Sequence, residues 1–145
     1  MTQEEIKGMI ERLRTFTVPE LCDGLPLYHV MDQEIKSWVG STHIVGIAVT
    51  VDVPAGEGAI VADAILELKP GDILVVAGKG NCASSYWGDH RSLCAKMMGA
   101  EAVIVDGAFR DIEGCEEIAF PIFAKGLTAG TALKSGVGAI NVPVA

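Results

Sequence analysis

Two short stretches of the chain carry side chains of the types that acid–base and metal chemistry require. Asp89 lies in the first stretch and the adjacent Arg110 and Asp111 lie in the second, with about twenty residues between. Asp supplies a hard oxygen ligand for Mg²⁺ or Mn²⁺. Arg supplies a planar fork of donors for a carboxylate or a developing enolate oxygen. If the two stretches meet in space, they predict a site for an anionic substrate beside a divalent cation.

The residues around Asp89 predict a second means of binding an anion. Gly88-Asp89-His90-Arg91 is expected to form the first turn of a helix, where backbone N–H groups lack partners within the helix and bind anions such as a carboxylate. A metal ion, Arg110 and this helix start would together hold a 2-oxo acid, with the metal as a Lewis acid on its carbonyl. We expect Asp89 also to cap the helix. Two roles are open for His90: a bystander, or a group that tunes proton transfer near neutral pH.

The segment from Ile73 to Val105 has the pattern strand, helix, strand. Apolar runs over 73–77 and 102–105 predict two buried strands. The helix between them ends at Gly99, and we assign its inner face to Leu93, Cys94, Met97 and Met98. Such a crossover joins parallel strands and brings the loops that follow them to one edge of the sheet, where ligands of open α/β sheets bind. Predicted loops at 78–81 and 106–111 would thus bring Asp89, Arg110 and Asp111 together.

The remaining pattern predicts one α/β domain over residues 1–145, with a central sheet flanked by helices. Helices are expected over 4–14, from Thr17 onward with Thr17 as the cap, over 60–68, and briefly after residue 111. Strict alternation over 43–53 predicts a strand with one apolar side. Further strands are expected near 122–123 and over 137–144.

Composition and charge argue against several classes of function. Half of the 145 residues are hydrophobic and the formal net charge is −8, so no nucleic-acid partner is expected, because phosphate binding needs clustered Lys and Arg. No apolar run reaches the roughly 18 residues of a membrane span, and the charged N-terminus has no secretory signal. None of the four cysteines forms a Cys-x-x-Cys pair. We therefore expect a cytoplasmic protein with reduced thiols and no membrane partner.

Several polar residues have a simpler interpretation than a role in chemistry. An adjacent pair such as Arg110-Asp111 is, taken alone, more often a surface ion pair or a turn than a site. Cys82 lies in a predicted polar loop, and a reactive thiol there is a weak alternative to a structural role. Lys79 does not complete a phosphate-binding loop. Structural or core roles are expected for Asp106, His29, His43 and Cys94.

The stretches that carry the candidate site resemble the 4-hydroxy-4-methyl-2-oxoglutarate aldolases, whose fold family includes the RraA proteins, regulators of ribonuclease E activity. The resemblance runs over nearly the whole chain and is most specific in the spacing from Gly88-Asp89 to Arg110-Asp111. The other matching stretches lie at residues 21–25, 69–76, 105–111 and 120–126. The resemblance implies the RraA-like swivelling β/β/α domain with a central parallel or mixed sheet.

The resemblance also implies a lyase with a small 2-oxo acid as substrate. Such an enzyme is a class II pyruvate aldolase that cleaves 4-hydroxy-2-oxo acids such as 4-hydroxy-4-methyl-2-oxoglutarate, decarboxylates oxaloacetate, or does both, through a metal-stabilised pyruvate enolate. It implies that Asp111 binds a divalent cation, Mg²⁺ or Mn²⁺, that Arg110 contacts the substrate carbonyl and steadies the enolate, and that Asp89 holds a metal-bound water. The helix start after Gly88 would bind the substrate carboxylate through the backbone amides of His90 and Arg91, where the aldolases have apolar side chains.

Assembly and length are further expectations from the resemblance. The family implies a homotrimer, or a hexamer built as a dimer of trimers, with sites between subunits. Its members usually continue past the region that matches residues 141–144, with an acidic stretch and closing strands, so this chain is expected to lack that segment. An acidic group that the longer aldolases supply to a neighbouring subunit would then be absent.

Two other functions stay open beside the lyase. The first is an RraA-type regulator that binds ribonuclease E through its acidic surface, without metal or catalysis. Asp111 favours the enzyme over this regulator, since regulator-type members often lack the second residue of the Arg-Asp pair. The second is a methyltransferase, a label that the family has carried, which we rank last because no strand is followed by a convincing Gly-rich nucleoside loop.

Overall fold

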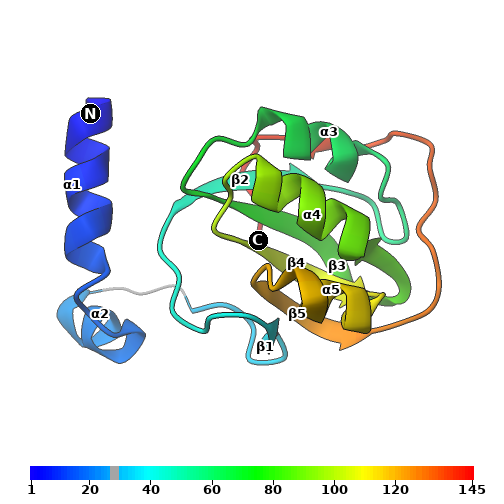
Figure 1. Ribbon diagram of the computed structural model, residues 1–145, viewed down its shortest axis with the longest axis horizontal. Coiled ribbons are helices and arrows are strands. Elements are labelled where there is room, and N and C mark those ends of the chain that lie inside the picture. Colours follow the sequence, from blue (N-terminus) through cyan, green and yellow to red (C-terminus); the bar gives the residue numbers. More distant parts are fainter. Residues whose placement is uncertain (27–29) are drawn as a thin grey trace.

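Six strands form one mixed sheet in the computed structural model, which describes residues 1–26 and 30–145 (Figure 1). The strands lie in the order β1-β5-β4-β3-β2-β6. The four inner strands, β2 to β5, run parallel, and β1 and β6 pair antiparallel at the two edges. The expected α/β class with a central mixed sheet is therefore confirmed. His29, expected to be structural, lies outside the described residues.

The bounds of the elements complete this description. The strands are β1 (Lys36–Val39), β2 (Ile47–Asp52), β3 (Asp72–Trp87), β4 (Ala102–Phe109), β5 (Ile122–Leu127) and β6 (Ala139–Ile140). The helices are α1 (Gln3–Leu13), α2 (Val18–Gly24), α3 (Ile60–Glu67), α4 (Asp89–Met97) and α5 (Ile112–Ile118). In the described part of the chain, no helix has the length and apolar character needed to cross a bilayer.

The core lies between the sheet and the three helices α3, α4 and α5, which cover the same face in Figure 1. Side chains of the central strands are completely buried there, including Val51, Leu74, Val103 and Ile122. Trp87, at the end of β3, stacks on Phe120 with ring centroids 6.1 Å apart. Burial of these aliphatic and aromatic side chains is the main favourable term that fixes the helices on the sheet.

The first two helices stand apart from this core (Figure 1). Each begins with a capping box, formed by Thr2 with Glu5 in α1 and by Thr17 with Glu20 in α2, as the predicted cap at Thr17 required. Neither helix buries a residue. Arg14 links them to the sheet layer, because its Nη2 donates to Val45 O and to Glu101 Oε1, both at 3.1 Å. The amphipathic pattern of the first helix and the cap at Thr17 of the second thus predicted both helices correctly, but not that they lie apart from the core.

Two strands are longer than the sequence predicted. The segment 78–81 was expected to be a loop, yet β3 continues through it to Trp87 with irregular register. Gly78 and Gly107 lie so close to the buried ring of Tyr86 that an added Cβ would come within 2.7 Å of it. Tyr86 Oη donates to Gly78 O at 3.0 Å, so this ring holds the curled end of β3 in place. Likewise β4 extends to Phe109 and leaves only Arg110 and Asp111 between β4 and α5.

Other sequence-based assignments were wrong in detail. The strand predicted over 43–53 begins only at Ile47, the final strand comprises only Ala139–Ile140, and β1 was not predicted at all. The predicted inner face of α4 was wrong for Leu93, Cys94 and Met97, whereas Met98, at the C-cap of the helix, packs partly buried against the core as predicted. The buried residues of α4 are Ser92 and Ala95, whereas Leu93 and Met97 are 47% and 79% exposed and Cys94 is exposed. Small residues are the buried ones because α4 packs closely against α5.

Candidate active site

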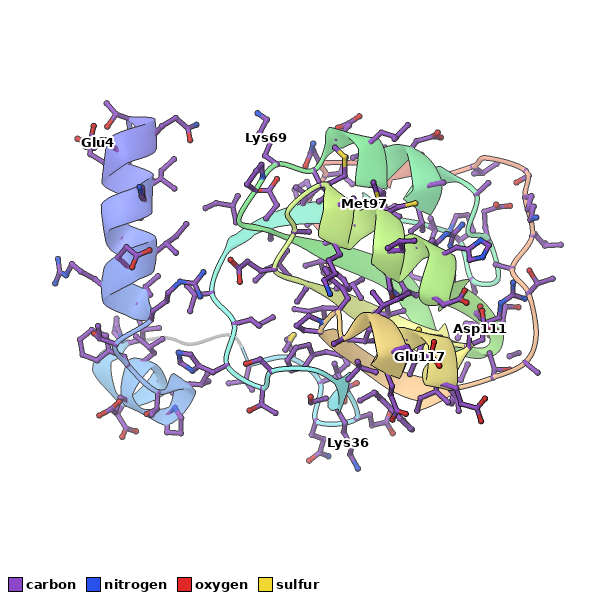
Figure 2. The ribbon with its side chains drawn as sticks, in the orientation of Figure 1. Glu4, Lys36, Lys69, Met97, Asp111 and Glu117 are labelled. Carbon is purple, nitrogen blue, oxygen red and sulfur yellow. The ribbon has the colours of Figure 1, made fainter. Side chains whose placement is uncertain are left out.

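The predicted site residues meet at one pocket beyond the carboxyl ends of β3 and β4. The pocket has a volume of about 400 Å³. Its walls include all six of the residues selected from the sequence: Gly88, Asp89, His90, Arg91, Arg110 and Asp111. Figure 2 shows Asp111 beside the starts of α4 and α5, at the end of α4 opposite Met97. The parallel pairing of β3 and β4 brings the two stretches together, as the crossover argument predicted.

Arg110 and Asp111 form a close pair on the turn between β4 and α5. Arg110 Nε lies 3.2 Å from Asp111 Oδ2, and both side chains are slightly less than half exposed. Asp111 has a left-handed backbone, with φ of 58°. Its Oδ2 lies against Gly88, where an added Cβ would come within 2.8 Å of that oxygen. The pair thus presents a carboxylate and a guanidinium side by side to the pocket.

Asp89 presents the second carboxylate, from the first turn of α4. The expected capping by Asp89 was wrong, because the N-cap of α4 is Gly88 and no side chain caps the helix. Asp89 Oδ1 accepts a hydrogen bond from the His90 N–H at 2.6 Å. Its Oδ2 lies over Gly114 of α5, where an added Cβ would come within 2.9 Å. The His90 amide expected to bind a substrate carboxylate therefore already has a local acceptor in Asp89. A ligand at this helix start would compete with that contact or use the neighbouring amides.

Arg91 lines the pocket but uses its guanidinium to hold the wall. Its Nη2 donates to Gly58 O at 2.8 Å, and its Nη1 donates to Tyr86 O. Burial lowers the pKa of Arg91, and the nearby charge of Arg110 lowers it further. The side chain still carries a positive charge at neutral pH. Arg91 and Arg110 therefore bring two positive charges to the pocket, which balance the carboxylates of Asp89 and Asp111 there, in a chain whose net charge is −8.

A segment that the sequence reading missed closes the pocket. Thr131, Leu133 and Lys134 belong to its lining, and the backbone of this segment is bound on two sides. Leu133 N–H donates to Gly56 O at 2.7 Å, and Gly58 N–H donates to Leu133 O at 3.0 Å. We call residues 130–135 the strap. Lys134 adds a third cationic side chain at the rim.

The carboxylate of Glu57 holds the strap in place through hydrogen bonds. Glu57 is only 4% exposed, and its Oε1 accepts from the N–H groups of Gly58 and Ala59, while its Oε2 accepts from the N–H and the hydroxyl of Ser135. The hydrogen bond from the Ser135 side chain is the largest cause that lowers the pKa of Glu57 from 4.5 to about 2, together with those backbone donors and against the opposing effect of burial. Nothing in the sequence around Glu57 indicates this role, since its partner lies 78 residues further along.

The carboxylates at the pocket fit a hard divalent cation that keeps most of its water. Asp111 and Asp89 both line the pocket and offer only oxygen ligands. No cluster of three His, Cys, Asp or Glu side chains able to enclose a metal is formed by residues 1–26 and 30–145. Mg²⁺ is commonly held by one or two carboxylates, with water and substrate completing its shell. The donor set therefore suits Mg²⁺ or Mn²⁺ and not a caged zinc ion.

The remaining predicted residues have structural surroundings. Asp106 accepts from the Gly80 N–H at 2.9 Å and lies 2.9 Å from Lys125 Nζ, consistent with its expected structural role. His43 Nε2 lies 3.2 Å from Arg14 O, next to the link between α1 and the sheet. Cys82 is exposed. Cys115, which the sequence reading did not select, is completely buried behind the pocket, and burial, more than the nearby carboxylates Asp89 and Asp111, raises the pKa of its thiol.

Comparison with known proteins identifies the family. A family model described as "Aldolase/RraA", RraA-like, matches residues 18–145. The chain belongs to the RraA-like family. Among curated proteins, this RraA-like chain is 37% identical over 144 residues to a protein of Halalkalibacterium halodurans named "Putative 4-hydroxy-4-methyl-2-oxoglutarate aldolase", covering 99% of the chain and 68% of that relative. A protein of Azotobacter vinelandii with the same name is 28% identical, over 89% of the chain and 80% of the relative.

Solved structures agree with the RraA-like fold. The RNA-processing inhibitor RraA from Thermus thermophilis superposes with a TM-score of 0.82 at 26% identity, covering 89% of the chain and 78% of that structure. A structure from Geobacillus kaustophilus named S-adenosylmethionine: 2-dimethylmenaquinone methyltransferase gives a TM-score of 0.81 at 28% identity, covering 88% and 79%. The family and the fold expected from the sequence are thereby confirmed.

Proposed function

We propose that this RraA-like protein is a divalent-metal-dependent lyase acting on small 2-oxo acids. The observation that carries the proposal is the convergence of Asp89, Arg110 and Asp111 on one pocket of about 400 Å³, beside a helix start. Its relatives named as aldolases support the same reaction class. The substrates proposed are oxaloacetate and 4-hydroxy-2-oxo acids such as 4-hydroxy-4-methyl-2-oxoglutarate.

Asp111 would hold the cation, with Asp89 close by to orient water. When bound, Mg²⁺ or Mn²⁺ supplies Lewis-acid polarisation of the 2-oxo group. The guanidinium of Arg110 donates to the same oxygen and stabilises the negative charge that collects there. The first turn of α4 and the cationic rim formed by Arg91 and Lys134 attract the carboxylates of the substrate.

The bonds change as follows for oxaloacetate. The bond between C3 and the C4 carboxylate breaks, carbon dioxide leaves, and the electron pair moves to give the enolate of pyruvate. Asp89 positions the water that returns a proton to C3, which yields pyruvate. For a 4-hydroxy-2-oxo acid, the 4-hydroxyl loses its proton to the water that Asp89 positions, the C3–C4 bond breaks, C4 leaves as the carbonyl carbon of the second product, and the electron pair gives the same enolate, which takes the proton back at C3.

Pyruvate release from oxaloacetate tests the proposal. Oxaloacetate is mixed with the protein and Mg²⁺ or Mn²⁺, and the rate of the metal alone is subtracted. We expect turnover that a chelator abolishes and that Asp111→Asn lowers about 100-fold, the scale on which loss of one strongly stabilising group acts. Asp63→Asn is the matched control, because Asp63 is an exposed carboxylate on α3 outside the pocket. Turnover unaffected by the chelator or by Asp111→Asn would contradict the proposal.

A regulator of RNA processing is the second candidate. The similarity to the Thermus RraA structure favours it, and it requires no metal. Binding of a ribonuclease E segment that survives Asp111→Asn, with no turnover of any 2-oxo acid, would favour this function. An assembly of three or six copies is proposed alongside either function, and sedimentation analysis measures it directly. A cytoplasmic location is likewise proposed.

A further inference from the structure

A chain of three hydrogen bonds, two buried and the last partly buried, runs behind the pocket from the ring of Trp87 to the backbone of Arg110. Trp87 Nε1 donates to Ser92 Oγ at 2.8 Å, Ser92 Oγ donates to Cys115 Sγ at 3.8 Å, and Cys115 Sγ donates to Arg110 O at 3.6 Å. None of the three side chains is more than 1% exposed. We propose that Ser92 and Cys115 are positioning residues, which hold Arg110 and Asp111 in the geometry that the proposed function requires.

The direction of this chain is fixed by its first member. An indole N–H can only donate, so Ser92 must accept from Trp87. The single hydroxyl proton of Ser92 is then free for Cys115, and the thiol proton is free for the Arg110 carbonyl. Any other arrangement would leave a buried donor without an acceptor, which costs about 1–3 kcal/mol. The three links therefore work as one unit and not as three independent contacts.

The chain holds Arg110 through both of its backbone polar groups, the N–H and the C=O, which belong to two successive peptide groups. Arg110 N–H donates to Trp87 O at 3.0 Å, and Arg110 O accepts from Cys115. Trp87 thus binds the backbone of Arg110 directly and begins the chain that returns to it. The next residue is also held, because Cys115 N–H donates to Asp111 O at 2.9 Å. The turn between β4 and α5 is in this way tied to β3, α4 and α5.

Asp111 needs this support because its backbone is unfavourable. A non-glycine residue with φ of 58° is disfavoured by about 1–2 kcal/mol, and such a conformation persists only when its surroundings fix it. Without the chain, the turn can relax, and the Asp111 carboxylate can leave its place against Gly88. Positioning of a metal-binding carboxylate by groups behind it commonly affects affinity about 10- to 100-fold.

The residue types also indicate a specific role beyond packing. Ser92 is completely buried in the middle of α4, where Ala would suit both the helix and the tight contact with α5. A buried hydroxyl is disfavoured unless it is hydrogen-bonded. The hydroxyl of Ser92 is satisfied by its two links, to Trp87 and to Cys115.

Variants at both positions test the proposal with two independent readouts. The variants are Ser92→Ala, Cys115→Ala and the conservative Cys115→Ser. Val61→Ala is the control, because Val61 is equally buried but lies on α3, outside the chain of hydrogen bonds. The first readout is amide hydrogen exchange over residues 109–116, which needs no metal or substrate. The second is the affinity for Mn²⁺ together with kcat and KM for oxaloacetate.

We expect both alanine variants to raise exchange over 109–116 about tenfold above the control, the effect of losing a stabilisation of about 1.4 kcal/mol. Affinity for Mn²⁺ should fall about tenfold and kcat should fall more than KM changes, because Arg110 acts on the enolate. Cys115→Ser, whose hydroxyl can still donate, should behave much like the wild type. Val61→Ala should alter none of these beyond its effect on global stability.

Three results would overturn the positioning role. One is exchange over 109–116 that is no faster in the alanine variants than in Val61→Ala. The second is Cys115→Ser behaving like Cys115→Ala, which would assign the effect to packing. The third is unchanged Mn²⁺ affinity in a metal-binding wild type. If Ser92→Ala does not fold, the comparison of the two Cys115 variants decides. A wild type without Mn²⁺ binding or turnover would instead refute the proposed function, and the exchange data would still decide the positioning role.

Discussion

Gly88 and Gly114 make room for the two carboxylates of the candidate site. An added Cβ would come within 2.8 Å of Asp111 Oδ2 at Gly88 and within 2.9 Å of Asp89 Oδ2 at Gly114. Gly88 has φ of −170°, an extended conformation that any residue adopts. The glycine is therefore needed for space and not for its backbone freedom. The carboxylates of Asp111 and Asp89 can lie where they do because Gly88 and Gly114, at the starts of α4 and α5, have no Cβ.

Gly88→Ala should therefore damage the site while leaving the fold intact. The new methyl group would displace the Asp111 carboxylate, so we expect the affinity for Mn²⁺ to fall about tenfold, as measured by calorimetric titration. Gly8→Ala in α1 is the control, since nothing lies within 4 Å of its added Cβ, and it should stabilise that helix by about 0.5–1 kcal/mol. Wild-type Mn²⁺ affinity in Gly88→Ala would show that Asp111 is not the ligand.

The sequence predicted the residue types of the site, but not everything that holds them. Asp89, Arg110 and Asp111 could be selected because their chemistry and the strand–helix–strand pattern both point to one sheet edge. Glu57 and Cys115 could not, because their surroundings are made by contacts distant in the chain. From the sequence, Glu57 between two glycines is expected in a solvated turn, and only the structure shows that Ser135 hydrogen-bonds to it. From the sequence, Cys115 is expected to be an ordinary apolar residue of a short helix, and only the structure shows its hydrogen bond with Ser92.

At the level of elements, hydrophobicity misled the prediction of α4. The prediction placed the more hydrophobic residues inside, namely Leu93, Cys94 and Met97. The buried residues of α4 are instead Ser92 and Ala95. A helix that packs closely against a neighbouring helix on the same face of a sheet, as α4 does against α5, favours small side chains at the contact. The extension of β3 was missed for a related reason. The two glycines at 78 and 80 indicate a turn, and only the ring of Tyr86 shows why the strand continues.

The strap depends on the charge of one buried carboxylate, which gives it a predictable response to acid. The pKa of Glu57 is lowered from 4.5 to about 2, so the unfolded state binds a proton before the folded state does. The stabilisation from Glu57 is therefore complete above about pH 4.5 and is lost as the pH falls toward 2. The Glu57→Gln variant has no such pH-dependent stabilisation to lose, because the amide does not titrate in this range.

Urea unfolding between pH 6 and pH 2 measures this difference. We expect Glu57→Gln to be less stable than the wild type at pH 6, with a gap in the unfolding midpoint that narrows as the pH falls from about 4.5 to 2. Glu113→Gln is a suitable control, since Glu113 is an exposed carboxylate in the first turn of α5. A gap that stays constant over this range would show that Glu57 does not carry the charge that fastens the strap.

For the molecule as a whole, the division between the first two helices and the sheet layer leads to the last prediction. The family match begins at residue 18, and neither α1 nor α2 buries a side chain. A variant starting with Met followed by residues 17–145 loses mainly the Arg14 contacts: the side chain with Val45 O and Glu101, and the carbonyl with His43 Nε2. A partly exposed ion pair contributes about 0–1 kcal/mol, which corresponds to a shift in Tm of up to about 4 °C. Thermal unfolding should therefore show a small shift in Tm for this deletion, only slightly larger than for Arg14→Ala in the full chain, which keeps the contact of the residue 14 carbonyl with His43. A much larger shift for the deletion alone would mean that the half-exposed Met9 and Phe16 are buried against another copy of the chain. Sedimentation of both variants would then reveal a loss of assembly in the deletion and not in Arg14→Ala.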